Sequence, residues 1–428
     1  MTARWLWRLR QLSRRIWVRA TLFSLAAVAT ALVAALLSPY IPSDLPAQIG
    51  ADAVDNILGI IAASMLTVTT FSLTTMVGAY SAATSNVTPR ATTLMMEDAT
   101  TQNMLATFIG SFLFSLVGII ALSAGIYGES GRVVLFGVTL AVILGVVVTL
   151  LRWIDHLSRL GRVTETTRRV EAAALAALRE RHREPAMGGA PLRDPDRDIP
   201  REARAVYATE IGYVQHVDVA GLADVAKAAG GRGADGSARR IFVRAVPGDF
   251  LDPTRPIACF AGFEGEDVEA GIRACFTIGD VRAFDQDPRF GISVLAEIAS
   301  RALSPATNDL GTAIDIVGRT VRVLAALAEP REGECEIEHP NVLVPPLDLA
   351  DLFDDLFIPI ARDGATLMEI GVRLQKALLT LSRLDAPGFA EEARRHAAEA
   401  LQRFEAGLTL DVDKRRVREA ASWLGRGE

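Results

Sequence analysis

Residues 56–89 read NILGIIAASMLTVTTFSLTTMVGAYSAATSNVTP, a run with no charged side chain that nevertheless carries many hydroxyls. A segment this apolar and this long predicts a helix that enters a lipid bilayer. As an α-helix its 34 residues would extend for about 51 Å, well beyond a hydrocarbon core of about 30 Å. The helix must therefore tilt strongly or extend past the membrane at one end.

Three further uncharged runs complete the predicted membrane domain. They cover residues 20–43, 99–128 and 133–151, and each is long enough for the ~20 residues that cross a hydrocarbon core. No run of this kind follows Leu151. The sequence thus predicts four transmembrane helices within residues 1–153, with the lipid bilayer as the surrounding partner.

The distribution of arginine predicts the orientation of these spans. Six arginines precede the first span and five follow the fourth within about twenty residues, whereas the loops on the opposite side hold Arg132 and four acidic residues. Because Lys and Arg are enriched in cytoplasmic loops, both termini are predicted to lie in the cytoplasm.

Charge also divides the chain in two. Residues 1–170 hold 13 Arg, no Lys and 8 acidic residues, a net charge of +5, whereas the remainder holds 32 basic and 43 acidic residues, a net charge of −11. Binding to nucleic-acid phosphates needs a basic face, so nucleic acid is not an expected partner.

The residue types needed for metal, cofactor or enzyme chemistry do not occur in suitable patterns. Cys259, Cys275 and Cys335 form no CxxC pair, and the five histidines show no ligand spacing. The sequence has no Gly-rich phosphate loop and no recognisable pair of nucleophile and base. We therefore expect no metal, no cofactor and no enzymatic activity.

Three segments are predicted beyond the spans. Residues 154–200 form a charged helical stalk followed, from about residue 185, by a linker rich in Pro, Gly and Asp. Residues 201–286 are rich in strand formers, and residues 287–428 follow helical patterns that begin with Asp287 as N-cap before Pro288.

The strand-rich segment predicts a small β-barrel-like subdomain. GYVQHVDV (212–219) and RIFVRAV (240–246) read as strands, and Pro247-Gly248-Asp249 reads as a tight turn. The expected fold class is a membrane α-helical domain with four transmembrane helices, followed by a cytoplasmic α/β domain with a barrel-like segment and a helical C-terminal part.

Two segments resemble a known family. SAATSNVTPR (81–90) and RALSPATNDLGTAIDI (301–316), with GYVQHVDV between them, are similar to the bacterial predicted membrane proteins called domain of unknown function 2254. The similarity extends over nearly the whole chain, although Leu310 stands where family members commonly have Pro. The resemblance implies an integral membrane protein with a cytoplasmic domain, and it implies no activity.

The hydroxyls of residues 56–89 gather on one face of the predicted helix. At 100° per residue this face collects Ser64, Thr67, Thr70, Thr74, Gly78, Ser81 and Ser85. Small residues let membrane helices approach closely, and hydroxyls can bond to the carbonyl four residues earlier, so the stripe can be a packing face. Alternatively, copies of the helix around an axis would line a water-filled pathway, and the length of the stripe favours this second interpretation.

Charged residues flank the same helix at both predicted membrane surfaces. Asp52 and Asp55 lie near the outer mouth of the hypothetical pore, and Glu97 and Asp98 lie near the inner one, after an elbow helix that begins at Pro89. They would favour cations modestly, and ordinary interfacial charge explains them equally well.

The remaining candidate is the SPATND loop. It comprises Ser304, Pro305, Asn308 and Asp309, together with Thr312 just beyond it. Asn308 or Asp309 as the cap of the following helix explains both residues, and the alternative is a small ligand or ion held at that helix N-terminus.

These features together predict a homo-oligomeric inner-membrane channel for ions whose cytoplasmic domain assembles or gates it. The alternative is a membrane-anchored sensor or scaffold, in which the spans only pack and the cytoplasmic domain binds a ligand or a protein.

Overall fold

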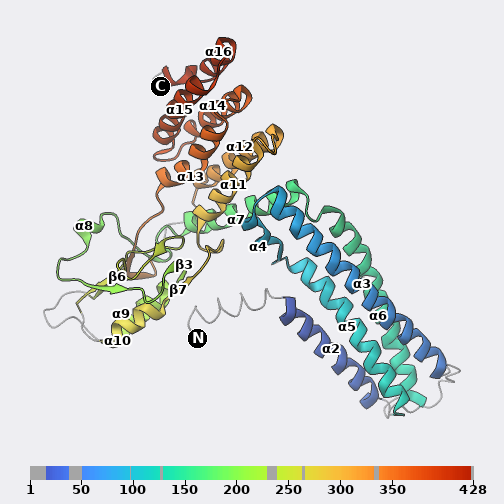
Figure 1. Cartoon of the computed structure of the whole chain (residues 1–428). Helices are drawn as coiled ribbons and strands as arrows, with labels where there is room; N and C mark the ends of the chain where they lie inside the picture. The colour runs from blue at the N-terminus through green and yellow to red at the C-terminus, as the bar shows by residue number, and fades with distance from the viewer. Residues whose placement is uncertain are drawn as a thin grey trace. The chain divides into compact units, whose positions relative to one another are not determined.

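The chain forms two compact units in the computed structural model (Figure 1). The model describes residues 16–37, 51–96, 98–125, 129–228, 239–262, 266–331 and 337–425. We call Trp7–Thr166 the bundle unit and Thr167–Glu428 the α/β unit.

The bundle unit is built from long apolar helices and one short one. These are α2 (Ile16–Leu37), α3 (Ala51–Asn86), α4 (Pro89–Met96), α5 (Ala99–Ser123) and α6 (Glu129–Arg159). Three of them are long and apolar enough to cross a membrane, over Ala53–Ser85, Ala99–Ser123 and Arg132–Arg159.

These three match the second, third and fourth predicted spans. The first predicted span overlaps α2, whose apolar part over Ala20–Thr30 is shorter than a membrane span among the described residues. A fourth span therefore stays a prediction.

Helix α5 is the centre of the bundle unit and packs against α2, α3 and α6. Its buried positions include the small residues Gly110, Ser111 and Gly118, which let neighbouring helices approach. A Cβ atom at Gly118 would lie 3.0 Å from a methyl group of Leu58 on α3.

The short helix α4 turns the chain between α3 and α5. It begins at Pro89 as predicted, and the Tyr80 hydroxyl donates to the Met95 carbonyl at 3.3 Å. Gly161, with φ of 77°, backs onto the same region, where a Cβ atom would lie 3.1 Å from the Ala79 Cα. The elbow is thus tied to α3, and the segment after α6 packs closely against α3 beside it.

The α/β unit contains two small sheets and no barrel among its described residues. The strands are β1 (Gly189–Pro191), β2 (Arg204–Tyr207), β3 (Gly212–Val217), β4 (Arg240–Val243), β5 (Phe250–Leu251), β6 (Pro256–Ala261), β7 (Phe276–Gly279) and β8 (His339–Val344). Five form a sheet in the order β1-β8-β4-β6-β2, and three form a sheet in the order β5-β3-β7. Neither sheet closes on itself, so the barrel prediction is wrong.

The reason lies in strand pairing, which the local pattern does not encode. The Pro247-Gly248-Asp249 turn, with Gly248 at φ of 103°, joins β4 of one sheet to β5 of the other instead of closing a hairpin. Strand β8, far along the chain, pairs in parallel with both β1 and β4. Because β1 is part of this sheet, residues 185–200 are not the simple linker that their composition predicted.

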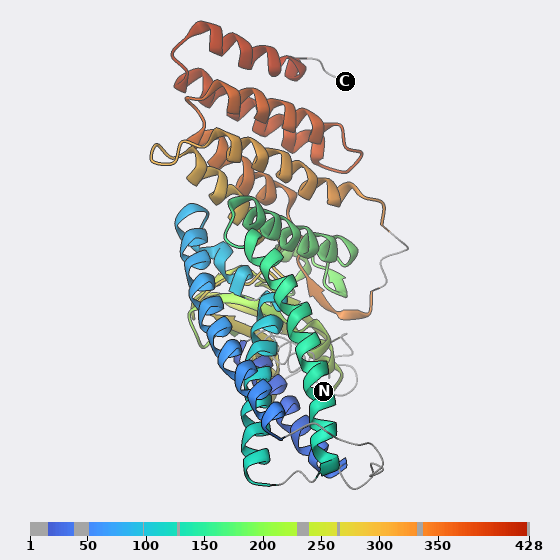
Figure 2. The same cartoon turned by 90° about the vertical axis from the view of Figure 1, so that its right-hand side faces the viewer.

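Helices alternate with the strands along the chain and form the C-terminal part. The first group is α7 (Val163–Arg183), α8 (Pro195–Asp198), α9 (Val219–Ala228) and α10 (Glu266–Ala274). Two of this group, α9 and α10, pack on the strands. The second group is α11 (Pro288–Leu303), α12 (Leu310–Ala325), α13 (Leu349–Asp363), α14 (Met368–Ser382), α15 (Phe389–Gly407) and α16 (Asp411–Ala420), with the short 3-10 helices η2 (Ala326–Ala328) and η3 (Ser422–Gly425). The second group stacks in successive layers, coloured orange to red in Figure 2.

One apolar core joins both sheets to α9 and α10. Val214, Ile241 and Phe260 from the strands meet Leu222 of α9 and Ile272 of α10, all at most 1% exposed. Asp287 accepts a hydrogen bond from the Phe290 amide and caps α11, as the sequence predicted. The helical C-terminal part of the fold prediction is confirmed.

Candidate functional site

Helix α3 has two opposite faces. One is buried in the bundle unit and consists of Val54, Leu58, Ile61, Met65, Thr69, Ser72, Met76 and Ala83. The other is exposed and carries the hydroxyl stripe predicted from the sequence, Ser64, Thr67, Thr70, Thr74, Gly78, Ser81 and Ser85. A Cβ atom at Gly78 would meet no described heavy atom within 4 Å. Packing inside the bundle unit therefore does not account for the stripe.

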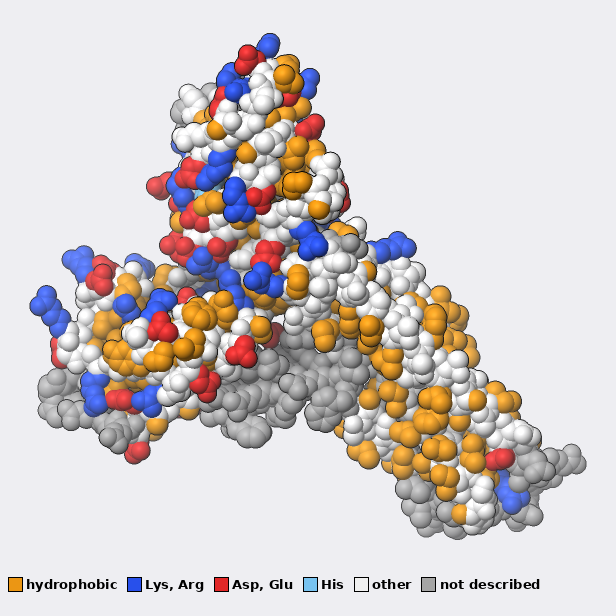
Figure 3. Space-filling view, viewed as in Figure 1, with side chains coloured by type: hydrophobic (Ala, Val, Ile, Leu, Met, Phe, Trp, Pro, Cys, Tyr) orange, Lys and Arg blue, Asp and Glu red, His pale blue; other side chains and the backbone are white. Residues whose placement is uncertain are grey.

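The surface around the bundle is largely apolar. Figure 3 shows apolar side chains and few charges over the visible face of this unit, with charged side chains gathered over the α/β unit. Leu66, Phe71 and Val77 are more than half exposed and flank the stripe on α3. The exposed hydroxyls thus interrupt a surface that otherwise suits lipid.

Four of the six stripe hydroxyls donate to carbonyls of their own helix. Thr67, Thr70 and Thr74 donate to the carbonyls of residues 63, 66 and 70 at 2.9, 3.0 and 3.1 Å, and Ser85 donates to the Ser81 carbonyl at 2.9 Å. A hydroxyl has one hydrogen to donate and two lone pairs that accept. Since the hydrogens are used within the helix, these residues present acceptor oxygens outward.

The predicted mouth residues lie in different settings. Asp55 is exposed on α3, while Glu97 and the side chain of Asp52 fall outside the described residues. Asp98 caps α5, accepting from the Thr101 amide at 3.1 Å, and its carboxylate lies 2.9 Å from His156 Nε2 on α6. Asp98 therefore joins two helices of the bundle, and its side chain is only 12% exposed.

The SPATND loop is a self-contained surface turn. Asp309 caps α12 by accepting from the Thr312 amide at 3.0 Å, the role expected from the sequence, and hydrogen bonding by the Thr312 hydroxyl lowers the pKa of its carboxyl. Asn308 has φ of 47°, in the left-handed region that Asn tolerates, and its amide donates to the Ser304 carbonyl. Pro305 is exposed, and the Ser304 hydroxyl donates to the Arg301 carbonyl. The loop's hydrogen bonds go to itself and to the two helices that it joins.

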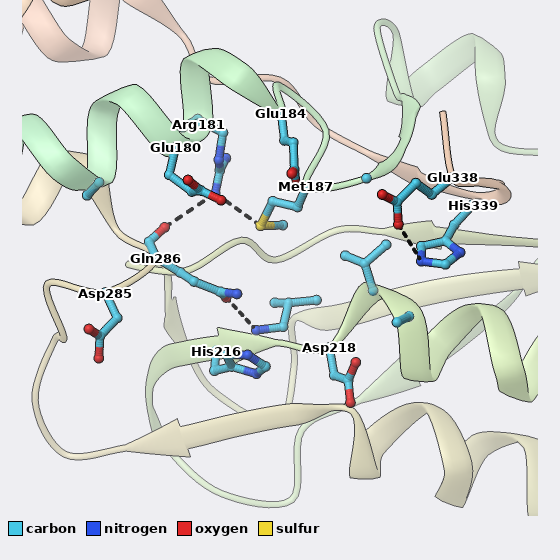
Figure 4. Close-up of a pocket in the computed structure, with 15 residues that line it drawn as sticks. Glu180, Arg181, Glu184, Met187, His216, Asp218, Asp285, Gln286, Glu338 and His339 are labelled. Atoms are coloured by element: carbon cyan, nitrogen blue, oxygen red, sulfur yellow. Dashed lines mark hydrogen bonds and ion pairs between the residues drawn. The ribbon is translucent and has the colours of Figure 1, made fainter. Parts of the chain in front are cut away.

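A pocket of about 260 Å³ lies in the α/β unit (Figure 4). Its walls come from the last turns of α7, the turn after α7, the junction of β3 and α9, the segment before α11, and the start of β8. Its titratable lining residues include Glu180, Arg181, Glu184, His216, Asp285 and His339. Its volume is close to the lower end of the ~300–1,000 Å³ usual for small-molecule sites.

Hydrogen bonds join these segments, and one residue between them has a strained backbone conformation. The Gln286 side-chain oxygen accepts from the Val217 amide at 3.0 Å, and the His339 amide donates to the Gly188 carbonyl at 2.9 Å. Met187 has φ of 53°, a conformation rare for residues of its bulk. Strain of this kind concentrates at functional sites.

Arg181 is the most unusual group in the pocket. It is 7% exposed, and one terminal nitrogen donates to the Gln286 carbonyl at 3.3 Å and to the Met187 sulfur at 3.2 Å. No carboxylate of the described residues forms an ion pair with it; Asp287, which attracts it from a distance, is held by Arg282 at 2.7 and 2.9 Å. Burial lowers the pKa of Arg181 to about 10, so it remains charged at neutral pH.

A family model for predicted membrane proteins, DUF2254, matches residues 13–380. The chain belongs to this family. The resemblance seen in the sequence is thereby confirmed, and it defines a membrane protein of a family with no assigned function.

The curated relatives of this DUF2254 chain come from mycobacteria. Uncharacterized proteins of Mycobacterium bovis and Mycobacterium tuberculosis are each 27% identical over 285 residues, which cover 64% of this chain and 52% of each relative. The chain thus spans about half the length of the curated relatives that it matches. No solved structure matches it.

The pocket of this DUF2254 protein was not predicted from the sequence. Arg181 lies among many charged residues of α7, and nothing in the local pattern separates it from exposed neighbours such as Arg179 and Arg183. One signal was present: Met187 precedes two glycines after a Pro, which marks a tight turn at the end of the helix.

Proposed function

We propose that this protein is a homo-oligomeric channel of the bacterial inner membrane, in which copies of α3 surround a pathway for ions. In this arrangement both termini and the α/β unit lie on the cytoplasmic side, where the α/β unit assembles or gates the pore. The observation that supports the proposal is the exposed hydroxyl stripe on α3, opposite the face that packs in the bundle.

The length of the stripe favours a lining role over a packing role. From Ser64 to Ser85 it extends for about 32 Å along the helix, close to the thickness of a hydrocarbon core. Close packing of two membrane helices needs small residues only near the crossing point. Hydroxyls along the whole core are better explained by contact with water or ions.

The direction of the hydroxyls favours cations. The hydrogens of Thr67, Thr70 and Thr74 bond within α3, so a lumen would be lined at these positions by oxygen lone pairs that can replace part of a cation's hydration shell. Asp55, exposed near one end of α3, would add a modest attraction.

Flux measurements on matched variants test the proposal. Thr74→Val keeps the shape of the side chain and removes the acceptor, so conductance or cation preference of protein in liposomes should change while oligomer size does not. Thr69→Val makes the same change on the buried face, where Thr69 also donates to the carbonyl four residues earlier, and should leave ion selectivity unchanged.

The opposite pattern would identify a packing face. If wild-type protein conducts no ion, Thr74→Val is silent and Gly78→Leu dissociates the oligomer, α3 associates without forming a pore. Bulk at Gly78 prevents close approach of two helices, whereas Val is nearly isosteric with Thr.

The second candidate function is a membrane-anchored sensor, and the pocket in the α/β unit favours it. In that case the bundle would only anchor and associate, and a ligand would act through the α/β unit. A pocket that binds its ligand in a protein without ion flux would support the sensor over the channel.

A further inference from the structure

We propose that the pocket of the α/β unit binds a small zwitterion, a molecule that carries a carboxylate and an ammonium group and has the size of a free amino acid. The proposal does not depend on whether α3 lines a pore. It rests on two opposite charges that both line the pocket and do not pair with each other: Arg181 in the last turn of α7 and Glu184 directly after that helix.

The first charge is Arg181. Its guanidinium carries five N–H donors, of which the described residues engage only one terminal nitrogen, with a carbonyl at 3.3 Å and a thioether sulfur, a weak acceptor. Arg181 is 93% removed from solvent, and a buried cation is normally paired with an anion. A ligand carboxylate is planar and matches the guanidinium fork with two parallel hydrogen bonds.

The second charge is Glu184, which follows the last residue of α7 and lines the same pocket. Residues three apart on a helix lie close enough to pair, yet Glu184 forms no ion pair with Arg181 or with any other described residue. Glu180 also lines the pocket, but it pairs with Arg183 at 2.9 Å. Glu184 therefore remains available for an ammonium group.

The remaining lining supports a ligand with both charges. Asp285 and Glu338 add negative charge around the rim, where Glu338 lies 3.8 Å from His339 Nε2, so a ligand that carries an ammonium group beside its carboxylate is favoured over a simple anion. Figure 4 shows Arg181 of α7 and Glu184 at the end of that helix, with Asp285 and Glu338 on opposite sides of the pocket. A cavity of about 260 Å³ limits the ligand to a small molecule.

The experiment measures the thermal stability of the full-length protein in detergent against a panel of free amino acids. The panel covers glycine, L-alanine, L-leucine, L-phenylalanine, L-glutamate, L-lysine and L-arginine, with acetate, inorganic phosphate and ethylamine as probes of each charge alone. At least one amino acid should raise the melting temperature in a concentration-dependent way, because a ligand that binds only the folded state stabilises it. The single-charge probes should need at least about tenfold higher concentration for the same effect.

Variants then assign the binding to the pocket. Arg181→Met should weaken the apparent affinity about a hundredfold, since it removes a buried charge partner, and Glu184→Gln should weaken it about tenfold while folding normally, since its side chain is exposed. Arg179→Met is the matched control, because it removes an exposed charge of the same helix that pairs with Glu329 outside the pocket, and it should bind like the wild type.

Three results would overturn the proposal. The first is a panel that leaves the wild-type melting temperature unchanged. The second is equal stabilisation by acetate or phosphate alone, which would mean a simple anion site. The third is an amino-acid effect that survives in Glu184→Gln with unchanged affinity, a test that holds even if Arg181→Met does not fold. None of these results depends on ion flux, so the channel and the pocket can fail separately.

Discussion

His396 is a buried titratable side chain among the C-terminal helices. Its side chain is 2% exposed, and its ring lies near those of Phe353 and Phe357 of α13. Two charged neighbours have opposite effects on the ring. Asp354 of α13, at 3.1 Å from Nε2, favours the protonated form, and Arg395, next to His396 on α15, disfavours it. Burial is the largest effect and lowers the pKa of His396, with smaller opposing contributions from Glu392 and Glu399.

The lowered pKa predicts acid sensitivity of the α/β unit. Because the folded-state pKa lies below the unfolded value of about 6.5, the stabilisation is complete above that value and is lost as the pH falls through the folded pKa. The melting temperature of the purified protein should therefore fall by a few degrees between pH 7 and pH 5, and His396→Gln should reduce this dependence while lowering stability at pH 7. His182→Gln, at a less buried site, is the control. An unchanged pH slope in His396→Gln would show that other groups cause the sensitivity.

At the scale of elements, α7 depends on an unusually close approach to α11. A Cβ atom at Gly291 of α11 would lie 2.6 Å from the Ala174 Cβ and 2.7 Å from its Cα. Glu171 of α7 adds ion pairs with Arg319 and Arg322 of α12. Helix α7 is thus packed against α11 and paired with α12, and its last turn places Arg181 at the pocket.

This contact predicts that Gly291→Ala destabilises the protein although Ala is the better helix former. The gain in helix propensity is about 1 kcal/mol, but backbone atoms of α7 cannot move aside as the end of a flexible side chain can, so we expect a net loss of about 1–3 kcal/mol. Gly311→Ala, in the first turn of α12, is the matched control, because its Cβ would lie 3.4 Å from the nearest described atom, Asp309 Oδ1. Chemical unfolding followed by circular dichroism measures both. Equal stability of the two variants would mean that α7 and α11 can separate at little cost.

The same contrast between local and long-range interactions explains what the sequence could predict. Helices that begin at Pro89, Pro288 and Leu310 were predictable because caps and prolines act within one turn. The open sheets were not, since β8 pairs with β1 and β4 through contacts between distant parts of the chain. Arg181 belongs to the second class: its type and helix were readable, but its lack of an ion-pair partner among the described residues is a property of tertiary packing.

At the scale of the whole molecule, the chain passes from the bundle unit to the α/β unit within α7. The first residues of this helix belong to the bundle unit, and its last turns line the pocket. The arginines that follow the last span lie at the start of this passage. The orientation predicted from those arginines therefore decides on which side of the membrane the pocket finds its ligand.

Cysteine labelling in intact cells tests that orientation. The background is a variant with Cys259, Cys275 and Cys335 replaced by Ala; of these, Cys275 is buried, and burial raises the pKa of the Cys259 thiol and slows its reaction. In this background a membrane-impermeant maleimide added from outside should label Ala47→Cys and Ser130→Cys, and it should label Arg201→Cys, an exposed position of the α/β unit, only after the membrane is opened. The physical reason is the retention of Arg-rich segments in the cytoplasm, six arginines before the first predicted span and five after the last.

Labelling of Arg201→Cys in intact cells, with protection of Ala47→Cys and Ser130→Cys, would mean that the topology is inverted and that the pocket lies outside. Residues 47 and 130 lie on the same side if α3 and α5 both cross, so a probe before α2, Thr2→Cys, tests the first span. Labelling of Thr2→Cys from outside together with Ala47→Cys and Ser130→Cys would mean that α2 does not cross the membrane and that the bundle has three spans.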